Sequence, residues 1–149
     1  MKDQFRVVVI GGGVVGASVI YHLAKFGWTD VCLLERSVLT AGSSWHAAGG
    51  IHALNADPNI AALQAYTIDL LQEIEDESGQ NIGLHMTGGL TMAGTEDRWE
   101  WLQAAYRMFQ SIGIDDCRLV TPEEARELNP IMSTDGFLGG MWADREGYL

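Results

Sequence analysis

The stretch Val7-Val-Val-Ile-Gly-Gly-Gly-Val-Val-Gly16 carries the strongest structural signal of this sequence. Its β-branched run predicts a strand over 7–10 that is buried on both faces of a parallel sheet. The glycines that follow have the spacing G-x-G-x-x-G and open a helix expected over 14–26. A second apolar run, over 31–34, ends at Glu35. Strand, helix and strand in this order predict a Rossmann-like βαβ unit, and therefore an α/β fold that binds a dinucleotide.

The glycine-rich turn is the first candidate binding segment. Gly11 permits a tight turn, Gly13 lets the backbone approach a pyrophosphate, and Gly16 lets the helix pack closely against the strand. The first helical residues, Val14 and Val15, lie where backbone N–H groups and the partial positive charge of the helix face the phosphates.

The acid after the second strand is the candidate ribose ligand. Glu35 stands 19 positions after Gly16, where a carboxylate can accept hydrogen bonds from the ribose hydroxyls. It would repel a 2′-phosphate, although the adjacent Arg36 weakens that argument against NADP. The motif itself does not separate FAD from NAD, because both carry an ADP moiety.

A second segment rich in small residues follows, and we expect it to return across the front of the nucleotide site. Ser43 and Ser44 can donate hydrogen bonds to phosphate or ribitol oxygens. The candidate cofactor contacts in this segment are Gly42, Ser43, Ser44, Trp45, His46, Ala47, Ala48, Gly49 and Gly50.

The stretch from Glu35 to Gly49, with its Trp-His-Ala-Ala-Gly sequence, closely resembles the FAD-dependent sarcosine and dimethylglycine dehydrogenases of the D-amino-acid oxidase and glycine oxidase superfamily. The likeness continues in Tyr21-His-Leu-Ala-Lys25, in Gly88-Gly-Leu90 and in Leu128-Asn-Pro130. It covers nearly the whole chain but only part of the family's length, and it implies an N-terminal fragment, inactive by itself.

The resemblance implies two parts for this fragment. Residues 1–55 would bind the ADP moiety of FAD and carry the flavin-linking loop. Residues 56–149 would form a helical segment and the beginning of the substrate-binding α+β region, so the domain is incomplete. The catalytic residues would lie beyond Leu149, and none is identified in this chain.

The resemblance also implies a chemistry. His46 would be joined covalently to the 8α carbon of the flavin, and a neutral imidazole is a competent nucleophile near pH 7. The parent protein would oxidise an N-methylated glycine by hydride transfer to flavin N5, with an electron-transfer flavoprotein or oxygen as acceptor. The full-length parent could also use tetrahydrofolate.

Two other classes of protein stay open. If the protein is an NAD(P)-linked dehydrogenase, the likeness of the segment around His46 to a flavin-linking loop is accidental. A non-enzymatic regulatory nucleotide-binding subunit would keep the fold without the chemistry.

Composition and charge limit the binding partners and the cellular location that we expect for this protein. The net charge of −11 excludes electrostatic binding to nucleic acid, and no apolar run reaches the ~20 residues that span a bilayer. Cys32 and Cys117 have no metal-ligand spacing, so we expect no metal site. The N-terminus leaves no room for a targeting segment, which predicts a cytoplasmic location, or the mitochondrial matrix if a transit segment is missing.

The remaining pattern predicts three helices and several strands. Asp57 and Pro58 begin a helix that Gly79 ends, Thr95 begins one that Gly113 ends, and a capping box begins a short one at Thr121. The expected apolar faces are Ile60, Leu63, Tyr66, Leu70 and Ile74 on the first of these, and Trp99, Leu102, Tyr106, Phe109 and Ile112 on the second. Residues 84–87 and 90–93 read as an edge hairpin, and 137–142 as a strand.

Overall fold

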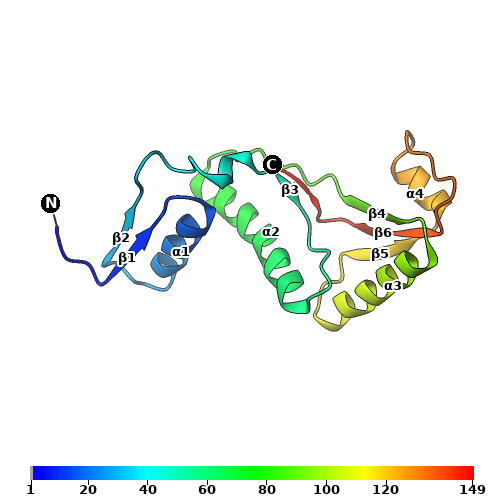
Figure 1. Ribbon diagram of the computed structural model, residues 1–149, viewed down its shortest axis with the longest axis horizontal. Coiled ribbons are helices and arrows are strands. Elements are labelled where there is room, and N and C mark those ends of the chain that lie inside the picture. The colour runs from blue at the N-terminus through cyan, green and yellow to red at the C-terminus, as the bar shows by residue number, and fades with distance from the viewer. Residues whose placement is uncertain (1) are drawn as a thin grey trace. The chain divides into compact units, whose positions relative to one another are not determined.

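The computed structural model describes residues 2–149, and the chain divides into two compact units, Met1–Ala48 and Gly49–Leu149. In the first unit the parallel strands β1 (Val7–Ile10) and β2 (Val31–Leu34) pair with Val7 opposite Val31. Helix α1 (Val14–Lys25) connects them, as Figure 1 shows in blue. The expected βαβ unit is confirmed.

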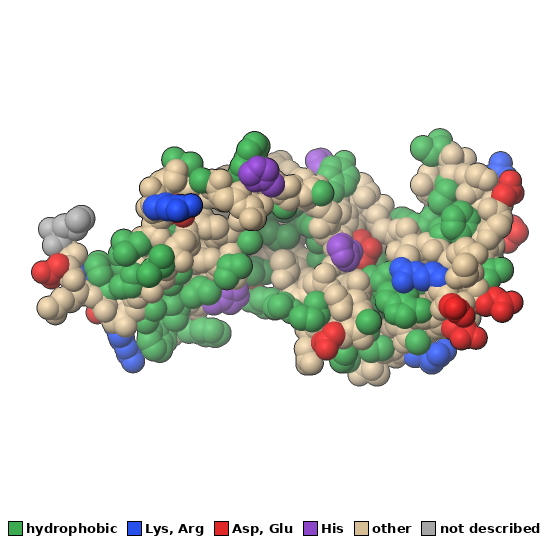
Figure 2. Space-filling model, in the orientation of Figure 1, with side chains coloured by type: hydrophobic (Ala, Val, Ile, Leu, Met, Phe, Trp, Pro, Cys, Tyr) green, Lys and Arg blue, Asp and Glu red, His purple; other side chains and the backbone are tan. Residues whose placement is uncertain are grey.

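Apolar side chains of the first unit are more exposed than the sequence predicts. Ile10 is 86% exposed and Val8 45% exposed, so the expected burial of this strand on both faces is wrong. Gly16 is the buried residue of α1, whereas Ala17 and Ala24 are exposed. The reason is that two strands and one helix offer too little surface to cover both faces. Figure 2 shows the resulting apolar surface over this unit.

The second unit is built around an antiparallel sheet with the strand order β4-β6-β5. These strands are β4 (Gly89–Ala93), β5 (Cys117–Val120) and β6 (Gly139–Ala143). A short ladder joins β3 (Gly50–Ile51) to β7 (Gly147–Tyr148). The helices are α2 (Pro58–Ser78), α3 (Glu96–Ser111) and α4 (Pro122–Leu128).

The predicted edge hairpin is wrong. Strand β4 pairs with β6, so that Leu90 lies opposite Trp142, and His85 forms an isolated bridge with Tyr148. Strand β5, which no pattern in the sequence predicted, covers the other edge of β6. Gly140 permits this close strand packing, since a Cβ there would lie 2.6 Å from Met92 Sδ and 2.9 Å from the carbonyl oxygen of Thr91.

The helix boundaries follow the sequence signals. Asp57 accepts hydrogen bonds from the N–H groups of Asn59 and Ile60, and Gly79 ends α2 in the left-handed conformation with φ 65°. Thr95 accepts from the N–H of Arg98 at the start of α3. Both hydrogen bonds of the α4 capping box are present: the Thr121 side chain accepts from the N–H of Glu124, and the Glu124 side chain accepts from the N–H of Thr121.

The core lies between α2, α3 and the sheet. Leu102 and Phe109 of α3 are fully buried and belong to one cluster with Ile68 of α2 and Met141 of β6. The expected apolar face of α3 is thus largely confirmed. That of α2 is largely wrong: Ile60, Leu63 and Tyr66 are exposed, and Ala61, Ile68 and Leu70 are the buried residues.

Acidic side chains gather at helix starts in the second unit, and Figure 2 shows them over the end that carries α3 and α4. Glu96 and Asp97 lie in the first turn of α3, and Glu123 and Glu124 in that of α4. They face the positive ends of the helix dipoles, which stabilises the helices. No helix of the described residues is both long and apolar enough to span a bilayer.

Candidate cofactor-binding site

The turn between β1 and α1 is so tight that only glycine fits at position 16, beside the carbonyl oxygen of Gly11. Gly11 has φ +106°, in the region that favours glycine, and its N–H donates to Leu34 O at 2.8 Å. A Cβ on Gly16 would lie 1.8 Å from the carbonyl oxygen of Gly11. Gly13 is the N-cap of α1 and has no side chain to accept from the first turn. Apart from the Val14 N–H, which donates to Ser44 Oγ, the first turn has no side-chain cap from Gly13 and can receive an anionic ligand.

The carboxylate of Glu35 lies against this turn. It accepts hydrogen bonds from the N–H of Gly12 at 2.7 Å and from the N–H of Ser37 at 2.8 Å. These N–H groups, that of Gly12 first, hold the pKa of Glu35 below its ordinary value. The carboxylate is therefore ionised at neutral pH and can accept hydrogen bonds from a ribose.

Gly12 is a structural residue that the motif by itself did not single out. A Cβ at this position would lie 2.6 Å from Leu39 Cδ2 and 3.1 Å from Glu35 Cβ. Its carbonyl oxygen accepts from the N–H of Thr40, whose own φ is +64°. The segment after Glu35 is thus held against the turn by backbone contacts, for which no side-chain signal exists in the sequence.

The second small-residue segment returns to the start of α1. Ser44 Oγ accepts a hydrogen bond from the N–H of Val14 at 2.8 Å, and a Cβ on Gly13 would lie 3.1 Å from the same oxygen. Ser44 belongs to the short 3-10 helix η1 (Ser43–His46). The serine thus joins the loop to the helix start, where we expect the phosphates.

A pocket of about 430 Å³ opens beside these contacts, within the usual range for a small-molecule site. Six of the sequence-predicted residues line it: Gly13, Glu35, Arg36, Gly42, Ser43 and Ser44. Ser37 and Ala41 also line it and were missed. Their only signal was their position beside predicted residues.

The other predicted residues lie outside this pocket lining. Gly11, Val14, Val15, Gly16, Trp45, His46, Ala47 and Ala48 belong to the same unit. Gly49 and Gly50 belong to the second unit, where Gly50 lines a different pocket.

The ring of His46 has a defined hydrogen-bond pattern. Its Nδ1 lies 3.1 Å from the carbonyl oxygen of Gly42, and a carbonyl oxygen can only accept, so Nδ1 carries the hydrogen of this bond. The ring lies 4.5 Å from that of Trp45, centroid to centroid. In a neutral imidazole held this way, Nε2 is the nitrogen with the free lone pair.

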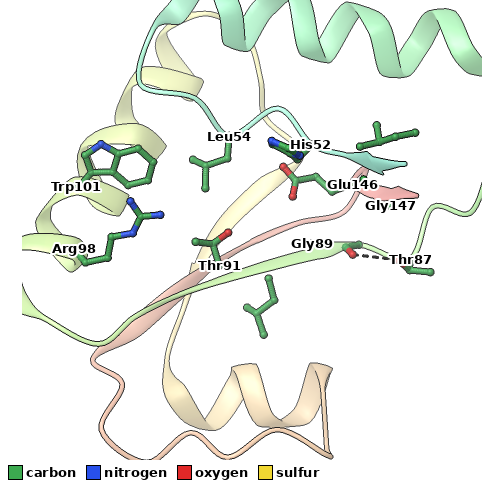
Figure 3. A pocket seen from close by; sticks show the side chains of 13 residues that line it. His52, Leu54, Thr87, Gly89, Thr91, Arg98, Trp101, Glu146 and Gly147 are labelled. Atoms are coloured by element: carbon green, nitrogen blue, oxygen red, sulfur yellow. Dashed lines mark hydrogen bonds between the residues drawn. The ribbon is translucent and has the colours of Figure 1, made fainter. Parts of the chain in front are cut away.

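A second pocket, of about 480 Å³, lies within the second unit (Figure 3). Its lining includes His52, Leu54, Thr91, Arg98, Trp101 and Glu146. Among residues 2–149, no group of three or more His, Cys, Asp or Glu side chains is placed to hold a metal ion.

Glu146 is a buried carboxylate at the edge of the second pocket, with 8% of its surface exposed. Its Oε1 accepts from the N–H of Ala53 at 3.0 Å. Burial raises the pKa of Glu146, and this outweighs the Ala53 hydrogen bond and the charge of His52, which act in the opposite direction. The residue ties the segment after β3 to the turn between β6 and β7.

This burial predicts a pH dependence for Glu146→Gln. A raised pKa in the folded state means that ionisation opposes folding, so wild-type stability falls as pH rises from 4.5, the ordinary value, through the raised one. We expect the difference in free energy of unfolding, variant minus wild type, to increase as pH rises through this window. Urea unfolding at several pH values measures it. The exposed Glu127→Gln is the control and should show no such gain; equal pH profiles for both variants would count against the burial effect.

Residues 6–149 match the family model described as FAD dependent oxidoreductase, DAO. The chain belongs to this FAD-dependent oxidoreductase family. The match includes both the glycine-rich turn and the His46 segment, so the recognition made from those residues is confirmed at the level of the family.

The relatives include both an enzyme and a regulatory subunit. Rat (Rattus norvegicus) mitochondrial dimethylglycine dehydrogenase is 38% identical over 149 residues, which are 99% of this chain and 17% of that protein. The mitochondrial pyruvate dehydrogenase phosphatase regulatory subunit of Mus musculus is 32% identical over 149 residues, 100% of this chain and 17% of that protein. The chain thus spans about a sixth of the length of these relatives.

A solved structure shows the same fold. L-proline dehydrogenase from P. horikoshii matches with a TM-score of 0.88 and 24% identity, over 99% of this chain and 38% of that one. The predicted fold class is therefore confirmed as a partial FAD-binding domain of this family.

Proposed function

We propose that this chain holds FAD for an enzyme that oxidises the CH–NH group of an N-methylated glycine, dimethylglycine or sarcosine. The observation that carries the proposal is the bond from the N–H of Val14 to Ser44 Oγ, which joins the His46 loop to the start of α1. The resemblance to dimethylglycine dehydrogenases over the whole chain supports the substrate class.

The residues present fit FAD. The open start of α1 beside Gly13 would bind the pyrophosphate, and ionised Glu35 would accept from the ribose hydroxyls. Ser43 and Gly42 line the pocket on the side of the loop and would contact the phosphates or the ribitol. Bound FAD would supply the two-electron acceptor for the amine.

His46 would tether the flavin through Nε2. Its Nδ1 is engaged with Gly42 O, so the remaining nitrogen would form the bond to the 8α carbon. The neighbouring Trp45 ring lies against the imidazole at a tilt of 50° and would limit its rotation. Gly11, Val15, Gly16, Ala47, Ala48, Gly49 and Gly50 complete the proposed cofactor contacts, and Arg36 would lie beside the ribose.

The partners of the whole protein follow from the same proposal. Electrons would leave to an electron-transfer flavoprotein or to oxygen, and tetrahydrofolate would bind in the full-length parent. A cytoplasmic location remains the expectation from the sequence, while the rat relative is named as mitochondrial.

The protein at its natural length, with its flavin, tests the substrate class. We expect anaerobic dimethylglycine to bleach the yellow absorbance of the oxidised flavin, because removal of hydride from the methyl carbon reduces it. Trimethylglycine is the matched control, since its nitrogen has no lone pair to stabilise the product cation. Bleaching by neither amine, or reduction of added NAD instead, would contradict the proposal.

A second candidate is a regulatory subunit without oxidase or dehydrogenase chemistry. The 32% identity to the regulatory subunit of pyruvate dehydrogenase phosphatase favours it. In that case the same experiment gives a bound flavin that no methylated amine reduces.

A further inference from the structure

The pocket of the second unit has a cation on one wall. Arg98 and Trp101 come from the first turns of α3, Thr91 from β4 and Leu54 from the segment after β3. Figure 3 shows Arg98 and Trp101 together at one side, His52 and Glu146 at the other, and Leu54 and Thr91 between them. The hollow therefore has a guanidinium at one side, a carboxyl and an imidazole at the other, and one apolar and one hydroxyl side chain between them.

The guanidinium of Arg98 is oriented by the indole of Trp101. Its Cζ lies 4.0 Å from the centroid of that ring, a cation–π contact. The π face of the indole offers no oxygen or nitrogen acceptor, so the guanidinium keeps N–H donors that suit the two oxygens of a carboxylate. The arginine is thus held in place without its donors being used by the indole.

No carboxylate of residues 2–149 forms an ion pair with Arg98. Arg145, by contrast, pairs with both Asp69 and Asp116. In a chain with a net charge of −11, an arginine without an acidic partner at a pocket wall is available to an anionic ligand.

Glu146 lies at the side of the hollow opposite Arg98 (Figure 3). Its Oε1 accepts from the N–H of Ala53, and only 8% of the residue is exposed. Arg98 thus presents its charge at one side of the pocket, while Leu54 and the Trp101 ring offer apolar contacts to the body of a ligand.

We propose that this pocket binds a small carboxylate, whose two oxygens accept from the edge N–H groups of Arg98 and whose carbon chain packs between Trp101 and Leu54. The pocket lies in a different unit from the His46 loop, and the inference does not depend on the proposed function. The carboxylate could be that of an amino-acid substrate or of a separate ligand, and the experiment distinguishes these sources.

The probe is propionate, compared with the uncharged isostere propionamide, on the flavin-loaded protein at its natural length. Saturation-transfer NMR titrations would give both dissociation constants. We expect propionate to bind at least tenfold more tightly than propionamide, and Arg98→Gln to remove that preference. Arg98→Lys should retain only part of it, because an ammonium cannot bind both oxygens in a fork.

Arg107→Gln is the matched control, since Arg107 is an exposed residue of the same helix that does not line this pocket. It should bind propionate as the wild type does, and circular dichroism would verify that each variant is folded. Equal binding of propionate and propionamide by the wild type, or an unchanged preference in folded Arg98→Gln, would overturn the proposal.

The source of the carboxylate is read from steady-state kinetics with dimethylglycine. A rise in KM that matches the loss of propionate binding in Arg98→Gln assigns the pocket to the substrate's carboxylate. An unchanged KM with lost propionate binding assigns it to a separate ligand. Because propionate binding is measured without turnover, an inactive protein would count against the proposed function and leave this measurement intact.

Discussion

Gly16→Ala is expected to abolish tight FAD binding and to destabilise the first unit. The new Cβ would lie 1.8 Å from the carbonyl oxygen of Gly11, far inside contact distance. Both partners are backbone, so no side-chain rotation relieves the overlap, and α1 must move away from β1. Overpacking of this kind costs ~1–3 kcal/mol, and the displaced helix start would no longer present its N–H groups to the pyrophosphate.

The measurement is the flavin content of the purified variant, together with its midpoint of urea unfolding. Gly94→Ala is the matched control, because a Cβ at that position would meet only the Phe137 ring, at an ordinary 3.8 Å. We expect Gly94→Ala to retain the wild-type flavin content. Wild-type flavin content in Gly16→Ala as well would refute the role assigned to the close contact between helix and strand.

His46→Ala is expected to eliminate covalently attached flavin while leaving dissociable FAD bound. The turn at Gly13 and the carboxylate of Glu35 are unchanged by this substitution, so the ADP half of the cofactor keeps its proposed contacts. Only the nitrogen that would bond to the 8α carbon is removed. The variant should be yellow when folded and should lose all of its flavin when denatured.

The measurement is the absorbance of the precipitated polypeptide after acid denaturation, for the wild type and for two variants. His22→Ala is the control, because His22 lies on α1 and bonds to the Ser18 carbonyl one turn earlier. It should retain the covalent flavin of the wild type. Release of all flavin from the wild type would refute the tether, and retention in His46→Ala would move it to another residue.

Sequence patterns predicted correctly those features of the structure that depend on residues close together in the chain. Strand β1, the glycine turn and α1 follow one another within a few residues, and caps such as Asp57 and Thr121 act within a single helical turn. The family itself was recognised from a contiguous segment around His46. Such features are determined by backbone conformation and by contacts over three or four positions, which periodicity and spacing express directly.

Tertiary structure alone decided the strand pairing and the buried faces. Gly89 to Ala93 pair with a strand some fifty residues later, because Gly140 lets β6 insert between β4 and β5, and Gly139 leaves room for the Trp99 ring of α3. The same holds for α2, where Ile68 faces the core and Leu63 faces outward although both are apolar. When a helix has apolar residues on several sides, their pattern does not identify the side that packs against the core.

Local sequence patterns were enough to predict a βαβ unit with an acid after its second strand, the family, and the helix boundaries. Only the tertiary structure placed Ser44 on the start of α1, buried Glu146 against Ala53, and gave Arg98 no acidic ion-pair partner among residues 2–149. The physical reason is that the Ser44 and Glu146 contacts join residues 30 and 93 positions apart in the chain. Whether a polar group meets a partner there depends on how the elements pack.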